Sequence, residues 1–184
     1  MEYKKYINRL HFIGSFVIFG LAFILHFLFE WTNYNEFVGA FSATNESIFQ
    51  HIKMVFYCVV IYYFISYFIF ANKFNINIRK YMFSILISFL LTSIIVVSTY
   101  YVLKEGFSVE SAFVNIASLL IGLFLSSLVN IHINNRIRIF NIHSNLSLVL
   151  IFVFAISLTY LHFNPLHTNF FYDIENQTYD NVIE

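Results

Sequence analysis

Charged residues, proline, glycine and cysteine are all scarce in this chain of 184 residues. Only 11% of the positions are charged and 59% are apolar, whereas a soluble domain has roughly 25% charged and about 45–50% apolar residues. A soluble fold has too little interior to hide that much apolar surface, so the composition places the chain in a lipid bilayer. The single cysteine, Cys58, excludes an intramolecular disulfide. One proline and five glycines leave few places where a helix would break.

Five apolar segments are long enough to cross a membrane, since a transmembrane helix needs about 20 mostly apolar residues. They cover approximately residues 10–31, 48–70, 82–103, 112–132 and 146–163. The chain contains no low-complexity linker and no soluble domain. We therefore expect one all-α integral membrane domain over residues 1–184, a bundle of five transmembrane helices.

The charges between these segments predict how the bundle is oriented. Eight of the ten basic residues fall in the N-terminus and in the second and fourth loops: Lys4, Lys5, Arg9, Lys73, Arg79, Lys80, Arg136 and Arg138. Nine of the ten acidic residues fall in the first and third loops and the tail: Glu30, Glu36, Glu46, Glu105, Glu110, Asp173, Glu175, Asp180 and Glu184. Because basic loops stay in the cytoplasm, we expect a multi-pass protein of the cell membrane with its N-terminus inside and its C-terminus outside.

Histidines gather at the predicted outer ends of the helices. His26 and His162 end the first and last spans, His51 lies near the start of the second, and His167 follows the last. Three carboxylates are close to them in sequence: Glu30, Glu46 and Asp173. Polar side chains near lipid are costly unless they pair with one another or meet water. The pattern therefore predicts a pocket that opens outward.

Imidazoles and carboxylates are good ligands for zinc and similar divalent ions. The candidate metal ligands are His26, His51, His162 and His167. The candidate catalytic residues are Glu30, Glu46, Ser47, His51 and Asp173. A catalytic zinc needs three protein ligands and an open position, which His51, His162 and His167 could supply. Glu30 or Asp173 would then orient an imidazole or act as a general base.

A reading without metal also remains open at the same place. Ser47 and His51 are four residues apart and share one helical face, so His51 could act as a general base for Ser47 or for a substrate hydroxyl. Ordinary capping and packing would give the same spacing. Lys53 is expected to extend towards the lipid headgroups.

The interior of the bundle carries fewer signals. Ser118, Gly122, Ser126 and Asn130 repeat every four residues, which is typical of a face where two helices approach closely. The third and fourth spans contain no aspartate, glutamate, lysine or arginine within their apolar stretches. Transporters usually have charges or broken helices near the midplane of the bilayer, so this pattern makes a transporter the weakest of the functional readings.

The whole chain resembles a family of small bacterial integral-membrane proteins that is known as a domain of unknown function. Three stretches carry the resemblance: residues 26–31 (His-Phe-Leu-Phe-Glu-Trp), residues 38–47 with His51 and Lys53, and residues 165–173. The family usually has Asp-Pro and a following Tyr-Gly, where this chain has Asp173-Ile174 and Tyr179-Asp180. The resemblance implies a multispan membrane protein and no particular activity.

The residues Ser47 and His51, followed by a distant histidine pair, are also similar to the pattern of alkaline ceramidases and related membrane hydrolases. That resemblance implies zinc chemistry in a seven-span bundle. This chain departs from it in having five predicted spans and in the spacing of His162 and His167, which are five residues apart.

The leading hypothesis is an outward-facing His/Glu site of a metal-dependent hydrolase or acyl-transfer enzyme that acts on lipid or envelope substrates. The alternative is a non-enzymatic membrane protein that binds a metal, a lipid or a partner subunit. We expect the lipid bilayer and a lipid or membrane-anchored substrate as partners, and no nucleic acid. The sequence leaves the oligomeric state open.

Overall fold

The computed structural model describes residues 2–74, 76–108, 111–136, 144–173 and 175–179, which form six α-helices, one π-helical turn and no β-strand. The elements are α1 (Glu2–Trp31), α2 (Glu36–Gly39), α3 (Ile48–Phe74), α4 (Ile78–Tyr101), η1 (Val102–Gly106), α5 (Ala112–Arg136) and α6 (Ser144–Phe163). Five of the helices are long and apolar enough to cross a membrane. The expected all-α fold with five candidate spans is confirmed, and the predicted segments agree with the helices apart from their ends.

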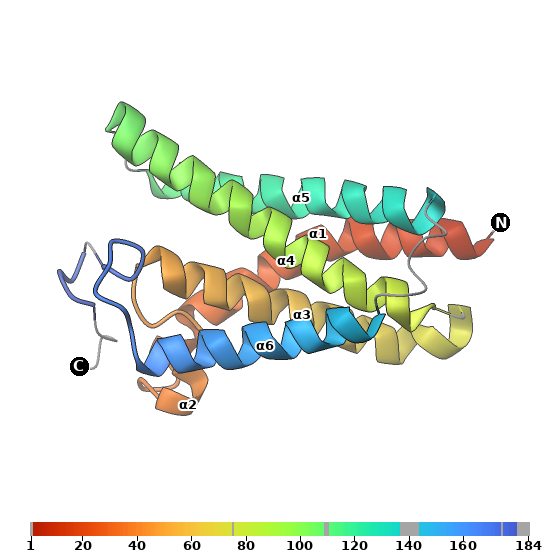
Figure 1. The fold of residues 1–184 in the computed structure, drawn as a ribbon, viewed down its shortest axis with the longest axis horizontal. Helices are drawn as coiled ribbons and strands as arrows, with labels where there is room; N and C mark the ends of the chain where they lie inside the picture. Colours follow the sequence, from red (N-terminus) through yellow and green to blue (C-terminus); the bar gives the residue numbers. More distant parts are fainter. Residues whose placement is uncertain (1, 75, 109–110, 137–143, 174, 180–184) are drawn as a thin grey trace.

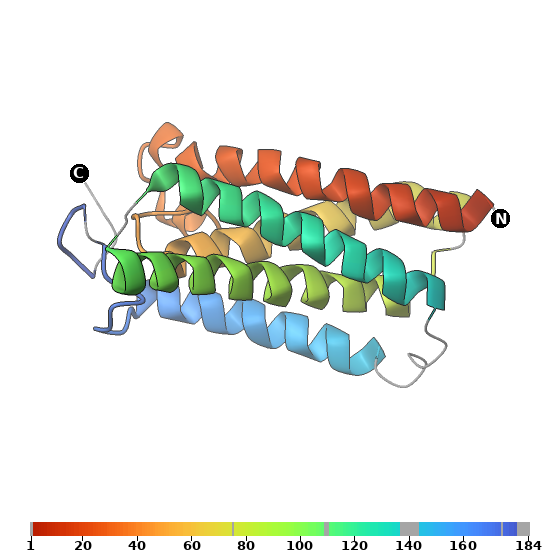
Figure 2. The ribbon, with the colours of Figure 1, turned by 90° about the horizontal axis from the view of Figure 1, so that it is seen from above.

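The five long helices alternate in direction and form one bundle (Figure 1). In Figure 2, α1, α5, α4 and α6 follow one another in a row. The central helix α3 packs across this row against α1, α4 and α6. It is the most buried of the five spans, with 50% of its most apolar window inside the protein.

The two ends of the bundle carry opposite charges. The end where α1 begins, called the basic end here, carries Lys4, Lys5, Arg9, Lys73, Arg79 and Lys80. The end where α6 finishes, called the acidic end, carries Glu30, Glu36, Glu46, Asp173 and Glu175. Large apolar side chains such as Phe68, Phe152 and Ile156 are exposed on the outer surface between the two ends. A lipid bilayer would cover such a surface.

A buried polar network joins four helices in the half of the bundle nearer the basic end. The side chains are His11 (α1), Tyr63 (α3), Ser88 (α4), Asn130 and Asn134 (α5). Asn134 Nδ2 lies 3.0 Å from His11 Nε2, and His11 Nδ1 lies 3.0 Å from the Tyr63 hydroxyl. Asn130 Nδ2 donates to Tyr63 at 3.1 Å and to Ser88 at 2.9 Å. Because Asn134 donates to Nε2, the ring proton of His11 is on Nδ1 and points to Tyr63.

The small-residue face of α5 packs as predicted. Ser118, Gly122, Ser126 and Asn130 are all buried. A Cβ atom added to Gly122 would lie 3.1 Å from Cα of Thr92 and 3.3 Å from its carbonyl oxygen. The backbones of α4 and α5 therefore meet at this point, and only the missing side chain of Gly122 allows the approach.

The tail that follows α6 folds back over the start of α3. Phe49 donates its main-chain N–H to the carbonyl of Phe170 at 3.0 Å, and its ring stacks on Phe171 with centroids 4.4 Å apart. Phe171 is buried. The tail thus covers the acidic end of the bundle rather than extending away from it (Figure 1).

The close approach of α4 and α5 predicts a position-specific cost of enlarging a glycine. Gly122→Val should lower the midpoint of thermal unfolding, because the added atoms force α5 away from the Thr92 backbone at a cost of about 1–3 kcal/mol. The control is Gly20→Val on α1, since Gly20 is exposed and nothing lies within 4 Å of an added Cβ. Equal midpoints for the two variants in detergent would contradict the packing described here.

Candidate metal centre

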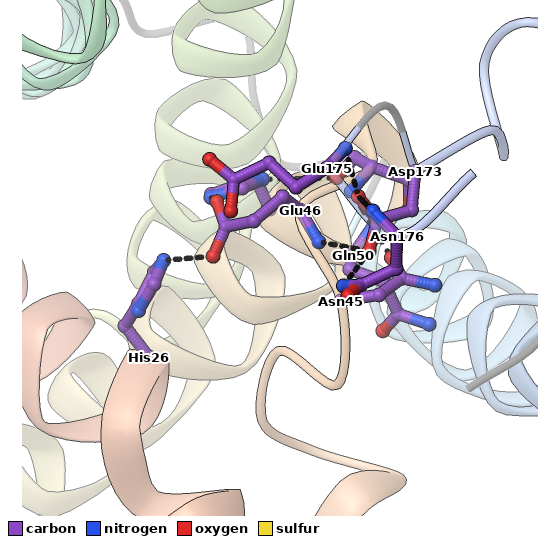
Figure 3. A network of polar contacts seen from close by, with 9 residues as sticks. His26, Asn45, Glu46, Gln50, Asp173, Glu175 and Asn176 are labelled. Carbon is purple, nitrogen blue, oxygen red and sulfur yellow. Dashed lines mark hydrogen bonds and ion pairs between the residues drawn. The ribbon is translucent and has the colours of Figure 1, made fainter. Parts of the chain in front are cut away.

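Three side chains converge at the acidic end of the bundle. His26 comes from the last turns of α1, Glu46 from the loop before α3, and His51 from the first turn of α3. Nε2 of His26 lies 3.3 Å from Oε1 of Glu46, and Nε2 of His51 lies 3.5 Å from Oε2 (Figure 3 labels His26 and Glu46). One ligand atom from each residue lies within 4.8 Å of the other two, so the group could hold a metal ion.

A hydrogen bond to the backbone fixes the proton of His51. Nδ1 of His51 lies 2.9 Å from the carbonyl oxygen of Ser47, which can only accept, so Nδ1 carries the hydrogen. In the neutral ring, Nε2 then presents its lone pair to the Glu46 carboxylate at 3.5 Å. Two acceptors repel at this distance unless a proton or a cation lies between them.

His26 is held differently from His51. Its Nδ1 atom is buried and has no hydrogen-bond partner among the described residues. The ring packs instead against Phe27 and His51, with centroids 4.9 and 5.3 Å away. Packing therefore sets the orientation of His26. In His51 the nitrogen that faces away from Glu46, Nδ1, is hydrogen-bonded, as it usually is in metal-binding histidines.

Glu46 remains a carboxylate in this environment. The hydrogen bond with His26 is the main cause that lowers the pKa of Glu46 below its ordinary value. His51 and His26 act in the same direction when they are protonated, and partial burial opposes them. Glu46 is therefore in the ionised form that binds a cation.

Asp173 positions Glu46 and the tail. Its Oδ2 accepts from the main-chain N–H of Glu46 at 3.3 Å and from Nδ2 of Asn176 at 2.8 Å (Figure 3). Its Oδ1 accepts from the main-chain N–H groups of Glu175 and Asn176 at 2.9 and 3.3 Å. The side chain is fully buried and both oxygens are occupied. The structure thus gives Asp173 the role of holding the backbone of the site, not of a free base.

The group faces a cavity of about 540 Å³. Its apolar walls come mainly from α1, α3 and α5 and include Phe19, Phe23, Phe27, Met54, Val55, Ile116 and Leu119. Its polar lining includes His26, Glu46, His51, Tyr100, Ser111, Asn115 and Glu175. From the sequence, Glu175 was identifiable only as an acidic residue of the tail. The turn that Asp173 caps brings it to the cavity, and Asp followed three residues later by Asn is the signal for such a turn.

Two of the other predicted catalytic residues lie elsewhere. Glu30 is exposed and does not line the cavity. Ser47 is buried, and its hydroxyl accepts from the main-chain N–H of Gln50 at 3.4 Å. His51 binds the carbonyl of Ser47 and not its hydroxyl. The spacing of Ser47 and His51 therefore corresponds here to helix capping and to orientation of the imidazole.

The two C-terminal histidines do not join the group. His167 is exposed and stacks on Tyr179 with ring centroids 4.7 Å apart. His162 is buried, and its Nδ1 accepts from Lys53 at 2.9 Å and from Gln50 at 3.3 Å. Although His162 is at the expected end of the bundle, it faces Lys53 and not His51.

Lys53 is completely buried, so the expectation that it reaches the headgroups is wrong. Its Nζ donates to the carbonyl of Gly39 at 2.6 Å and to His162 at 2.9 Å. No carboxylate among the described residues pairs with it. Lys53 and His51 point about 200° apart around α3, so one faces α6 and the other faces α1. Lys53 thereby ties α3 to α6 and to the end of α2.

Removing the Lys53 amino group should destabilise the protein. Lys53→Met keeps the aliphatic stem but leaves the buried carbonyl of Gly39 without its donor, which costs about 1–3 kcal/mol. The midpoint of thermal unfolding in detergent should fall accordingly. Lys73→Met is the control, because Lys73 is exposed at the basic end. If Lys53→Met and the control unfold at the same temperature, the contacts of Lys53 make no net contribution to the free energy of unfolding.

Comparison with curated proteins and with solved structures finds no match to this chain. A family model does match, and it covers residues 1–180. The matched region includes the five long helices, the loop that carries Glu46 and the tail that carries Asp173. The chain therefore belongs to DUF6512, a family of unknown function.

Proposed function

We propose that this protein binds a divalent metal ion, zinc or a similar one, through His26, Glu46 and His51 and uses it to hydrolyse a lipid-type substrate. The observation that carries the proposal is the contact between His51 and Glu46. The Ser47 carbonyl fixes the proton of His51 on Nδ1, so a lone pair faces a carboxylate 3.5 Å away. A cation between the two removes the repulsion and uses both as ligands.

The geometry of the group supports a cation between the rings. Nε2 of His26 lies 3.3 Å from Oε1 of Glu46 and Nε2 of His51 lies 3.5 Å from Oε2, so each imidazole faces its own carboxylate oxygen. Two histidines and one glutamate are also a set of ligands found in catalytic zinc sites, which keep one further position open. That position would face the cavity.

A bound metal of this kind would lower the pKa of a coordinated water towards neutrality and polarise a substrate carbonyl. Glu175 is the proposed general base, since it lines the same cavity and contacts Asp173 through its main-chain N–H. Asp173 keeps both Glu46 and the Glu175 backbone in position. Tyr100 and Asn115 offer hydrogen bonds to the polar part of a substrate.

The walls of the cavity favour a substrate with an acyl chain. Phe19, Phe23 and Phe27 repeat every four residues and give α1 one aromatic face along the cavity. The volume of about 540 Å³ is within the range of about 300–1,000 Å³ that is usual for ligand sites. An acyl chain along this face would bring an ester or amide bond to the ligand group. Candidate substrates are therefore lipids, lipoproteins and other membrane-anchored envelope molecules.

The charges of the loops support an orientation with the acidic end outside. The site would then act at the outer leaflet of the cell membrane.

The similarity to alkaline ceramidases supports only the general class of chemistry, because His162 and His167 do not accompany His51. The alternative is a non-enzymatic membrane protein that binds a cation through the same three residues but does not cleave any substrate.

Metal binding should depend on the histidines of the group and not on other histidines at the same end. Purified protein incubated with zinc and then desalted should retain about one equivalent by elemental analysis, as three protein ligands imply. His26→Ala and His51→Ala should lose it. His167→Ala is the matched control and should keep it, because His167 is exposed outside the group. Wild-type protein without retained metal, or His51→Ala protein with it, would contradict the site.

Turnover should depend on Glu175 after the metal is bound. Zinc-loaded protein in nanodiscs should cleave at least one member of a panel of ester- and amide-linked lipids, and Glu175→Gln should slow this by about 10²–10⁴-fold with unchanged zinc content. Glu36→Gln is the control, since Glu36 is exposed in α2 and does not line the cavity. Bound zinc without cleavage of any lipid in the panel would favour the non-enzymatic alternative.

A further inference from the structure

A second concave surface lies at the basic end, at the opposite end of the bundle from the metal group. This groove between α1 and α5 has a volume of about 520 Å³. It is lined by Lys5, Asn8, Arg9, Phe12, Ile13 and Ile131. None of these residues belongs to the candidate metal centre, so the groove requires its own explanation.

The polarity of the groove changes along α1. Lys5, Asn8 and Arg9 come first, and Phe12 and Ile13 follow one turn later on the same face. From Lys5 to Ile13 the helix rises about 12 Å, at 1.5 Å per residue. Ile131 of α5 adds to the apolar part. A phospholipid has the same order, with a charged phosphate at the membrane surface and acyl chains below it.

The cations of the groove are available to a ligand. Lys5 and Arg9 are both exposed, and no carboxylate among the described side chains pairs with either one. Asn8 accepts from Nδ2 of Asn135 at 3.0 Å through its Oδ1, which leaves its own amide N–H groups as donors. Arginine can bind a phosphate with two parallel hydrogen bonds, and lysine adds a second positive charge.

We propose that this groove binds one anionic phospholipid, with its phosphate between Lys5 and Arg9 and an acyl chain against Phe12, Ile13 and Ile131. Charge complementarity selects the occupant. Seven lysines and arginines lie at the basic end of the described chain, and in the sequence only Glu2 adds a negative charge there. Basic pockets between transmembrane helices at the cytoplasmic side commonly bind anionic headgroups. The proposal is independent of the metal centre and of any catalysis.

Native mass spectrometry of the full chain in detergent tests the proposal with phosphatidylglycerol as the anionic probe and phosphatidylcholine as the zwitterionic one. One phosphatidylglycerol should bind in preference to phosphatidylcholine. The double variant Lys5→Gln/Arg9→Gln should bind phosphatidylglycerol about 30-fold more weakly, as expected for the loss of two cations at the headgroup level. The matched control is Lys73→Gln/Arg79→Gln, which removes the same charge from the same end outside the groove, and it should bind like the wild type.

Two further measurements separate the groove from simpler explanations. Soluble glycerol phosphate should not displace the lipid, because it lacks the chain that contacts the apolar part. Phe12→Ser should weaken binding without any change in charge. Equal losses in the two double variants would reduce the effect to diffuse charge at the basic end and overturn the proposal. Efficient displacement by glycerol phosphate, or unchanged binding by Lys5→Gln/Arg9→Gln, would overturn it as well.

Discussion

A polar side chain inside a bundle that faces lipid must find its hydrogen-bond partners within the protein, and the arrangement of the helices follows from that requirement. The apolar outer surface suits the bilayer but specifies little about which helix packs on which. The buried polar groups supply that information. His11 can bind Tyr63 and Asn134 together only if α1, α3 and α5 meet at one depth and one rotation. Lys53 imposes the same kind of condition on α3 and α6 through His162.

The same requirement explains how irregular segments come to build a site. Glu46 lies in a loop, which alone would leave its carboxylate poorly fixed. Lys53 holds the end of α2, where this loop begins, through the carbonyl of Gly39, and Asp173 holds the loop through the N–H of Glu46 itself. Asp173 is in turn kept in place by a tail whose Phe171 stacks on α3. The two histidines need no such support because they stand on helices, so loop, tail and helix together give one defined geometry.

Sequence reasoning predicts depth in such a protein better than rotation. The lengths of the apolar segments give the level at which each residue meets the membrane boundary, so His26, Glu46 and His51 are correctly expected at one end. The direction in which a side chain faces depends on neighbours that the sequence does not specify. His162 is therefore at the expected level and yet binds Lys53. Lys53 itself has the pattern of a residue that reaches the surface, because only the fold supplies a carbonyl and an imidazole for it. Glu175 lies in the irregular tail, where no periodicity gives its direction.

The position of the ligand residues in the chain has a consequence for biogenesis. His26, Glu46 and His51 all belong to the first two spans or to the loop between them. The chain is synthesised from the N-terminus, so these three residues enter the membrane with the first helical hairpin. Asp173 and Glu175 are synthesised only after all five spans. The three residues of the proposed ligand group are therefore made long before Asp173, which holds Glu46 in position, so the geometry of the group is completed only when the tail folds back on α3.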